Sequence, residues 1–231
     1  MNAKKLQILP RICYTDAMII TSQGNQFLKL QVGDLVVAVN PISKDSTLKT
    51  SRFGADICLV SINHPDFNGT EQVALGGKQP LVIHGPGEYE IREVFIRGLP
   101  SHSSYAQTKG GLMNTIYRFI FDGINICVLG ALDTASLPAE TKEDLGEIDI
   151  LFLPIGGDGT LSPAEAYKLA VSLEPKLIIP LGYDAPGAVK DALKIFLKEA
   201  GESVTAVDKL TLKRKDLDGK EGDVAVLACQ Q

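Results

Sequence analysis

IDILFLPIGGDGTLSPAEAYKLAVSLEP, residues 148–175, contains a continuous apolar run, a glycine-rich turn and a capped helix. The run 148–154 does not alternate polar with apolar residues, which is typical of a strand covered on both faces. Ser162 is a favoured N-cap, Pro163 suits the first helical position, and Glu165 completes a capping box. The stretch therefore predicts a strand followed by a helix, the repeating unit of α/β folds.

The turn inside this stretch, PIGGDGT at residues 154–160, does not match a phosphate-binding loop. It lacks the Gly-Lys-Ser/Thr of a P-loop and the G-x-G-x-x-G spacing of a dinucleotide site. We therefore interpret it as a tight connection between strand and helix. HGPGEYE, residues 84–90, is similarly interpreted as a Pro-Gly turn that opens a strand.

A second strand–helix unit follows the first. KLIIPL, residues 176–181, predicts a strand, and residues 188–201 carry apolar side chains at helical spacing, with Gly201 as the stop signal. A further helix is expected around residues 138–145. The second half of the chain therefore consists of strands alternating with helices.

The first half of the chain is rich in short strand-like runs separated by turns. Asp122-Gly123 lies between two such runs and is a strong hairpin signal. The expected strands are residues 18–21, 26–32, 35–40, 56–62, 79–84, 88–99, 114–123 and 124–131, with closing strands at 202–217 and 222–230.

The order of these segments predicts an α/β (α+β) fold, in which two mixed sheets pack together and helices cover the outside. Residues 18–231 are expected to form one domain, and residues 1–17 an N-terminal tail or an extra edge strand. A domain of this length buries roughly 70–75% of its unfolded surface. We therefore expect a core that needs no disulfide to hold it.

Composition and charge exclude several classes of protein. The net charge of −5 gives no general attraction to nucleic acid, and the locally basic run 209–220 is interpreted as a solvated strand edge. No apolar run approaches the roughly 20 residues of a membrane span. The four cysteines, Cys13, Cys58, Cys127 and Cys229, contain no C-x-x-C pair. We expect reduced, buried thiols and a cytoplasmic location, with a disulfide framework or a cysteine metal site as the alternative.

The three histidines, His64, His84 and His102, all lie near the ends of predicted strands. Each one alone is explained as a surface or hydrogen-bonded side chain. Together with Asp66, however, His64 and His102 follow successive strands of the first half, and loops at one end of a sheet often carry function. We therefore expect His64, Asp66 and His102 to gather at one end of the fold.

Several segments resemble the metallo-β-lactamase superfamily, in particular its lactonase-like, Zn-dependent hydrolase branch. LVSINHPDF resembles the T-H-x-H-x-D-H motif with which that superfamily binds one or two metal ions. GPGEYEIREVFIRGLPSH and IDILFLPIGGDGTLSPAEA resemble later family segments, and the similarity runs from about residue 18 to the end. The resemblance implies a four-layer αββα sandwich.

The family's metal ligands carry over only in part. The resemblance implies that His64 and His102 match two histidines of the first metal site. It implies that Asp66 matches the motif aspartate, which binds the second metal and would be catalytic only in an active enzyme.

At the other ligand positions the sequence departs from the family. Ile62, Phe67, Ala131 and Gly182 stand where two motif histidines, the bridging aspartate and the final histidine belong. A catalytic zinc usually has three protein ligands, and the first site would keep two. Burial of Ile62 and Phe67 would stabilise a metal-free site by roughly 1.5–3 kcal/mol each.

We therefore interpret His64, Asp66 and His102 as remnants of a metal site in a non-catalytic binding or scaffold protein that needs no cofactor. Its partner would be a small molecule or a protein. The alternative is a hydrolase of lactones or phosphoesters with an altered zinc or manganese site of one or two ions. In that case Asp133 or His84 would supply the third ligand.

Overall fold

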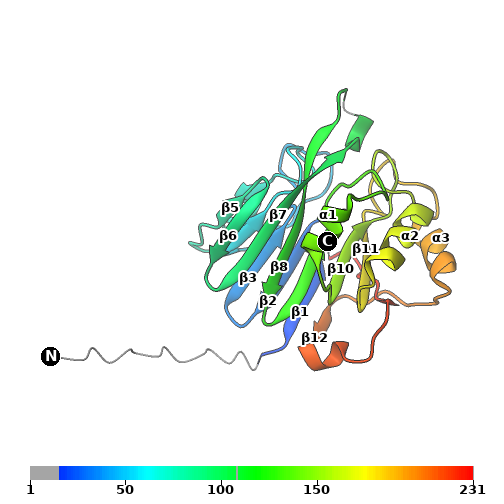
Figure 1. Ribbon diagram of the computed structural model, residues 1–231. Helices are drawn as coiled ribbons and strands as arrows, with labels where there is room; N and C mark the ends of the chain where they lie inside the picture. Colours follow the sequence, from blue (N-terminus) through cyan, green and yellow to red (C-terminus); the bar gives the residue numbers. More distant parts are fainter. Residues whose placement is uncertain (1–15, 108, 231) are drawn as a thin grey trace.

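The computed structural model describes residues 16–107 and 109–230 of the chain (Figure 1). Cys13 and nearly all of the predicted tail, residues 1–15, lie outside the described residues. Two sheets face each other across an apolar core, and the α-helices lie on the outside of one of them. The predicted pair of mixed sheets with outer helices is therefore confirmed.

The first sheet has six strands. Their order is β12 (Leu210–Leu212), β1 (Met18–Ser22), β2 (Leu28–Val32), β3 (Leu35–Val39), β4 (Ile57–Leu59) and β5 (Leu81–Ile83). The pairs β3–β4 and β4–β5 are parallel, and the other pairs are antiparallel. Strand β2 alternates buried and half-buried residues, because only one of its faces packs against the other sheet.

The second sheet has seven strands. Their order is β13 (Asp223–Val224), β11 (Leu177–Leu181), β10 (Ile150–Pro154), β9 (Ile124–Val128), β8 (Leu112–Phe121), β7 (Val94–Ser103) and β6 (Gly87–Ile91). Strands β9, β10, β11 and β13 run parallel, whereas β6–β7, β7–β8 and β8–β9 pair antiparallel. Every residue of β10 is buried, as the uniformly apolar run predicts.

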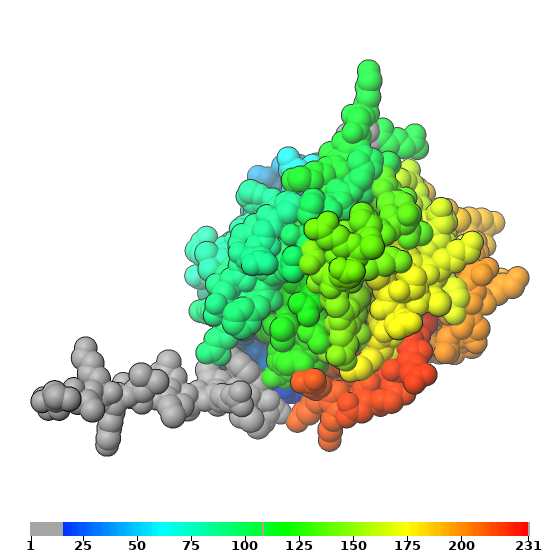
Figure 2. Space-filling view, viewed as in Figure 1, coloured from blue at the N-terminus to red at the C-terminus, as the bar shows by residue number. Residues whose placement is uncertain are grey.

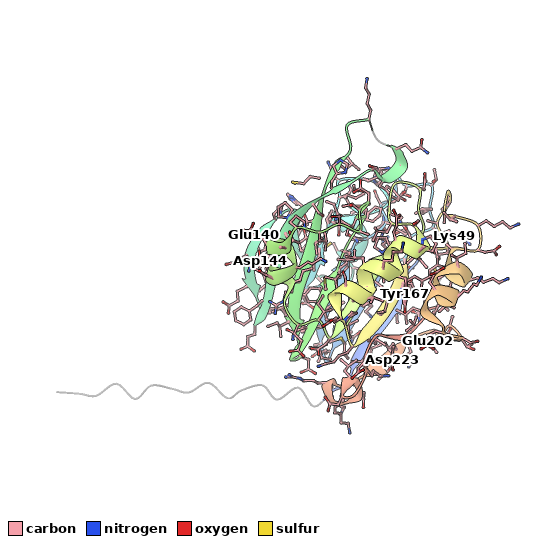
Figure 3. All side chains as sticks on the ribbon, turned by 45° about the vertical axis from the view of Figure 1, so that its right-hand side comes forward. Lys49, Glu140, Asp144, Tyr167, Glu202 and Asp223 are labelled. Carbon is pink, nitrogen blue, oxygen red and sulfur yellow. The ribbon has the colours of Figure 1, made fainter. Side chains whose placement is uncertain are left out.

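Three α-helices pack against the outer face of the second sheet. They are α1 (Ala139–Leu145), α2 (Pro163–Leu173) and α3 (Ala192–Ala200). The capping box of α2 forms as predicted, because Ser162 and Glu165 exchange hydrogen bonds. Asp144 lies on α1 (Figure 3), and its ion pair of 2.8 Å with Arg97 ties α1 to β7. Tyr167 of α2 packs edge-on against Phe196 of α3, with ring centroids 6.1 Å apart.

Irregular chain and short 3-10 helices complete the structure. The 3-10 helices are η1 (Thr70–Val73), η2 (Tyr105–Gln107) and η3 (Arg214–Leu217). The outer face of the first sheet packs against Ile42 and Ala55 of the segment between β3 and β4 and against Val73 of η1. The hydroxyl of Tyr117 in β8 lies 2.9 Å from the carbonyl oxygen of Val60 and accepts from the N–H of Gly85 at 3.1 Å, which joins the two sheets.

Some expected elements have different limits. Residues 88–99 form the hairpin β6–β7 rather than one strand, with Arg92 and Glu93 at positive φ in its turn. Arginine and glutamate are not turn-forming residues at such positions, so the sequence lacked the usual signal. Helix α3 begins at Ala192 and not at residue 188, because Asp191 is left-handed. Segments 202–217 and 222–230 are mostly irregular and contain only η3 and the short strands β12 and β13.

The cysteines and the membrane prediction agree with the described part of the chain. Cys58 and Cys127 are buried thiols inside strands, and burial raises the pKa of each to about 12. Cys229 is half-buried. Within residues 16–107 and 109–230, no helix is long and apolar enough to cross a bilayer. The cytoplasmic location stays a prediction.

Candidate functional site

Several strand ends meet at one edge of the second sheet. Strands β9, β10 and β11 are parallel, and β7 runs in the same direction because β8 is antiparallel to both of its neighbours. His102 lies at the carboxyl end of β7, and the segments that follow β9, β10 and β11 carry Ala131, residues 156–160 and Gly182. The topology thus brings His102 to one edge with Ala131 and Gly182, two of the positions where the sequence departs from the family's ligands.

A buried cluster of four side chains lies at this edge. It consists of Ile62, Phe67, Tyr105 and Ala131, with Leu112 half-buried against them, and we call it the Tyr105 cluster. The ring of Phe67 meets that of Tyr105 edge-on at 4.9 Å between centroids. The predicted gathering of Ile62, Phe67 and Ala131 at one spot is therefore confirmed. Gly182 and Tyr105 line the same narrow recess.

Asp66 lies at the border of the Tyr105 cluster, and both of its carboxylate oxygens accept hydrogen bonds. The hydroxyl of Tyr105 donates to Oδ2 at 2.8 Å, and the hydroxyl of Ser46 donates to Oδ1. Burial, reinforced by the adjacent Asp66, raises the pKa of Tyr105 well above its ordinary value. Tyr105 therefore stays protonated and remains a donor to Asp66 at neutral pH.

His64 contacts both members of that pair. Its ring meets the Tyr105 ring edge-on at 5.1 Å, and its Nδ1 accepts a hydrogen bond of 3.2 Å from the backbone N–H of Asp66. Nδ1 also lies 3.5 Å from Oδ2 of Asp66. A neutral imidazole whose Nδ1 accepts carries its proton on Nε2. In this arrangement neither ring nitrogen has a lone pair left for a metal ion.

His102 makes a different set of contacts. Its Nδ1 lies 2.7 Å from Oδ2 of Asp133, and the hydroxyl of Ser104 donates to the same oxygen at 2.7 Å. The His102 side chain is 58% exposed. Its Nε2 lies so close to Gly111 that any Cβ at that position would overlap the ring. A carboxylate at Nδ1 leaves Nε2 as an acceptor, so this ring keeps the tautomer of a metal ligand.

These side chains do not fit the metal centre that the family resemblance implies. Within the described residues, no group of three or more His, Cys, Asp and Glu side chains is placed to hold one metal ion. The oxygens of Asp66 are already hydrogen-bonded, His64 is in the wrong tautomer, and the Tyr105 cluster is apolar apart from one hydroxyl. Asp133 pairs with His102, whereas His84 lies at the end of β5 in a separate recess.

Two residues of this site carried no signal in the sequence. Tyr105 and Ser46 complete the bonding of Asp66, yet an isolated Tyr or Ser in a polar loop has no recognisable motif. The glycine-rich turn needs glycine for a structural reason that the sequence motifs did not reveal. Gly159 lies against the backbone of Ser104, where a Cβ would overlap the carbonyl oxygen, and its own carbonyl accepts the Ser104 N–H at 3.2 Å. The turn thereby holds the segment that carries Tyr105.

Comparison with known proteins points to one superfamily. A family profile described as "Beta-lactamase superfamily domain" matches residues 19–182. A UPF0173 metal-dependent hydrolase of Lysinibacillus sphaericus is 26% identical over 212 residues, covering 78% of this chain and 91% of that protein. A UPF0173 metal-dependent hydrolase of Pyrobaculum islandicum is 25% identical over 225 residues, covering 84% and 96%.

A solved structure agrees with these matches. A candidate Zn-dependent hydrolase of the metallo-beta-lactamase superfamily from Thermotoga maritima superposes with a TM-score of 0.71 and 29% sequence identity, covering 91% of this chain and 98% of that one. The descriptions of these relatives agree better with the metal-dependent hydrolase alternative than with the non-catalytic interpretation. The side chains around Tyr105, by contrast, favour the non-catalytic interpretation.

Proposed function

The chain belongs to the β-lactamase superfamily domain family, and from this premise we propose that it is a metallo-β-lactamase-fold binding protein without metal-dependent hydrolase activity. The observation that carries the proposal is the hydrogen bond of 2.8 Å from Tyr105 to Asp66. It engages the one family ligand of the second metal that the sequence retains.

Three physical features support this function. A buried metal ion needs several donors with free lone pairs, whereas both oxygens of Asp66 and Nδ1 of His64 already accept hydrogen bonds. Ile62, Phe67 and Ala131 are at most 1% exposed, so the cluster is stable without an ion. Opening it for metal would break the Tyr105 and Ser46 hydrogen bonds and expose apolar surface.

A second candidate function is a metal-dependent hydrolase with an altered site. The descriptions of the relatives favour it, and so does the ligand-ready tautomer of His102 beside Asp133. Zinc or manganese would be the ion. This candidate requires His64 to change tautomer and the Tyr105 segment to move.

Turnover assays distinguish the two functions. Bis(p-nitrophenyl) phosphate and a simple γ-lactone are offered to the full chain with zinc, with manganese and with chelator. We expect no turnover above buffer under any condition. Chelator-sensitive turnover that is lost in His64→Ala and His102→Ala, but kept in the exposed control Asp45→Asn, would establish the hydrolase instead.

A further inference from the structure

A recess of about 590 Å³ opens beside the Tyr105 cluster. Its walls come from the segment after β4, from the end of β5 and from the start of β8, and Ile62 and Leu112 belong both to the recess and to the cluster. Small-molecule sites commonly enclose about 300–1,000 Å³. The volume is therefore sufficient for a small ligand. In Figure 2 the end of the β7–β8 hairpin projects from the body of the molecule. Leu112 and Met113, at the start of β8, line the recess.

The lining of the recess selects against charged ligands. It contains apolar side chains, among them Ile62, Leu112 and the 61%-exposed Met113, together with amide and hydroxyl groups. Among the described residues, no Asp, Glu, Lys or Arg lines it, and His84 is the one titratable side chain in its wall. A charged group that enters such a site loses hydration without gaining a counter-ion, which costs free energy.

Two neighbouring asparagines provide the polar recognition. Nδ2 of Asn68 donates a hydrogen bond of 2.8 Å to Oδ1 of Asn63, and both side chains line the recess. In the described part of the chain, neither side chain makes a further hydrogen bond. The Nδ2 of Asn63 is therefore left as a donor and the Oδ1 of Asn68 as an acceptor. A ligand that offers one carbonyl and one N–H on the same group matches this pair.

We propose that this recess binds an uncharged carboxamide with an apolar body. The body lies against Met113 and Leu112, and the amide pairs with Asn63 and Asn68. An aromatic body gains additionally from the sulfur of Met113. The proposal assigns a ligand class to the binding protein proposed above. It rests on that proposed function in one respect, namely that the ligand is bound without being hydrolysed.

Three probes of nearly equal size and different charge test the proposal: benzamide, benzoate and benzylammonium. Binding to the full chain is measured by saturation-transfer NMR and by titration calorimetry in chelator at about pH 8, where histidine is ordinarily neutral. We expect benzamide to bind at least about tenfold more tightly than either ion, equivalent to about 1.4 kcal/mol. Equal binding of all three, or no binding of benzamide, would overturn the proposal.

Substitutions assign the binding to this recess. Asn68→Leu keeps the size of the side chain and removes the amide, and it should weaken benzamide binding about fivefold or more. Asn125→Leu, the same change at the start of β9 and outside the recess, should leave the affinity unchanged. Met113→Lys changes an exposed side chain, and it should reverse the preference so that benzoate binds more tightly than benzamide. Failure of both Asn68→Leu and Met113→Lys to alter selectivity would place the binding elsewhere.

The same experiment separates this proposal from the proposed function. Binding is measured in chelator, so it does not depend on whether the chain takes up zinc. Metal-dependent turnover together with benzamide binding in chelator would refute the non-catalytic function and leave the ligand class standing. Absence of both would refute the ligand class alone.

Discussion

The hydroxyl of Tyr105 donates a hydrogen bond of 2.8 Å to the carboxylate of Asp66 at the border of the Tyr105 cluster. Tyr105 comes from the segment after β7, and Asp66 from the loop after β4, so the bond joins the two sheets. It also aligns the Tyr105 ring with His64 and Phe67. Asp66 thus has a structural partner in Tyr105.

Tyr105→Phe removes this hydrogen bond and keeps the ring. Because the acceptor is a carboxylate, the variant should lose roughly 1.5–3 kcal/mol of unfolding free energy. Tyr183→Phe is the matched control, since its hydroxyl donates at 2.7 Å to the uncharged carbonyl of Leu227 and should cost only about 0.5–1.5 kcal/mol. Urea denaturation of both variants measures the difference. An equal loss in the two would show that the Asp66 bond has no special role.

Gly159→Ala tests whether the glycine-rich turn positions the Tyr105 segment. A Cβ there overlaps the carbonyl oxygen of Ser104 and lies on a backbone with φ of +82°. Gly219→Ala is the control, because Gly219 has φ of +75° and no atom within 4 Å of the added Cβ. We expect the control to cost about 1 kcal/mol and Gly159→Ala to cost clearly more. The melting temperatures of the two variants measure the difference. An equal decrease in both would contradict the close approach of Gly159 to Ser104.

We expect the stability of the protein to depend on pH through the carboxyl group of Asp56. Burial opposes its ionisation, but Lys78, the N–H of Val36 at 2.9 Å and Arg92 at 2.6 Å outweigh burial and lower its pKa. A lowered folded-state pKa adds stability above the unfolded-state pKa, near 3.9, and this stability is lost as the pH falls through the folded-state pKa. Asp56→Asn should therefore destabilise the protein at about pH 7 and much less at about pH 2.5. The exposed control Asp45→Asn should change little at either pH, and a pH-independent loss in Asp56→Asn would contradict the ionic role.

Restoring the family ligands should create a metal site. We expect Ile62→His, Phe67→His, Ala131→Asp and Gly182→His together to raise zinc affinity, measured by competition with a chromophoric chelator. The same variant should be less stable without metal, because polar groups replace buried apolar ones. Zinc binding as tight in the unchanged chain as in this variant would show that the four residues do not limit the site.

Much of the fold could be predicted because local signals agreed with it. The apolar run of β10, the capping box at Ser162 and the Asp122-Gly123 turn each specify an element by short-range chemistry. The hairpin at Arg92-Glu93 was missed because its turn residues are unusual. Residues 202–217 alternate like a strand, but they pair with β1 at only three positions, Leu210–Leu212.

The site was predictable only in part, for a different reason. The clustering of Ile62, Phe67 and Ala131 followed from family positions, and the geometry confirms it. The partners of the retained polar residues did not follow, because Ser46, Tyr105 and Ser104 reach them from loops distant in sequence. The shared metal role of His64, Asp66 and His102 stays a prediction: His64 is bonded to Asp66, and His102 to Asp133.

The melting temperature of the purified chain in zinc, in manganese and in chelator tests the central claim most directly. An ion that binds only the folded state stabilises it by RT ln(1 + [L]/Kd), about 2.7 kcal/mol when the ion is at 100 times its Kd. If Tyr105 and its neighbours have replaced the metal centre, the three melting temperatures will coincide. A melting temperature that falls in chelator and recovers with stoichiometric zinc or manganese would contradict the account and establish a metal-binding hydrolase site.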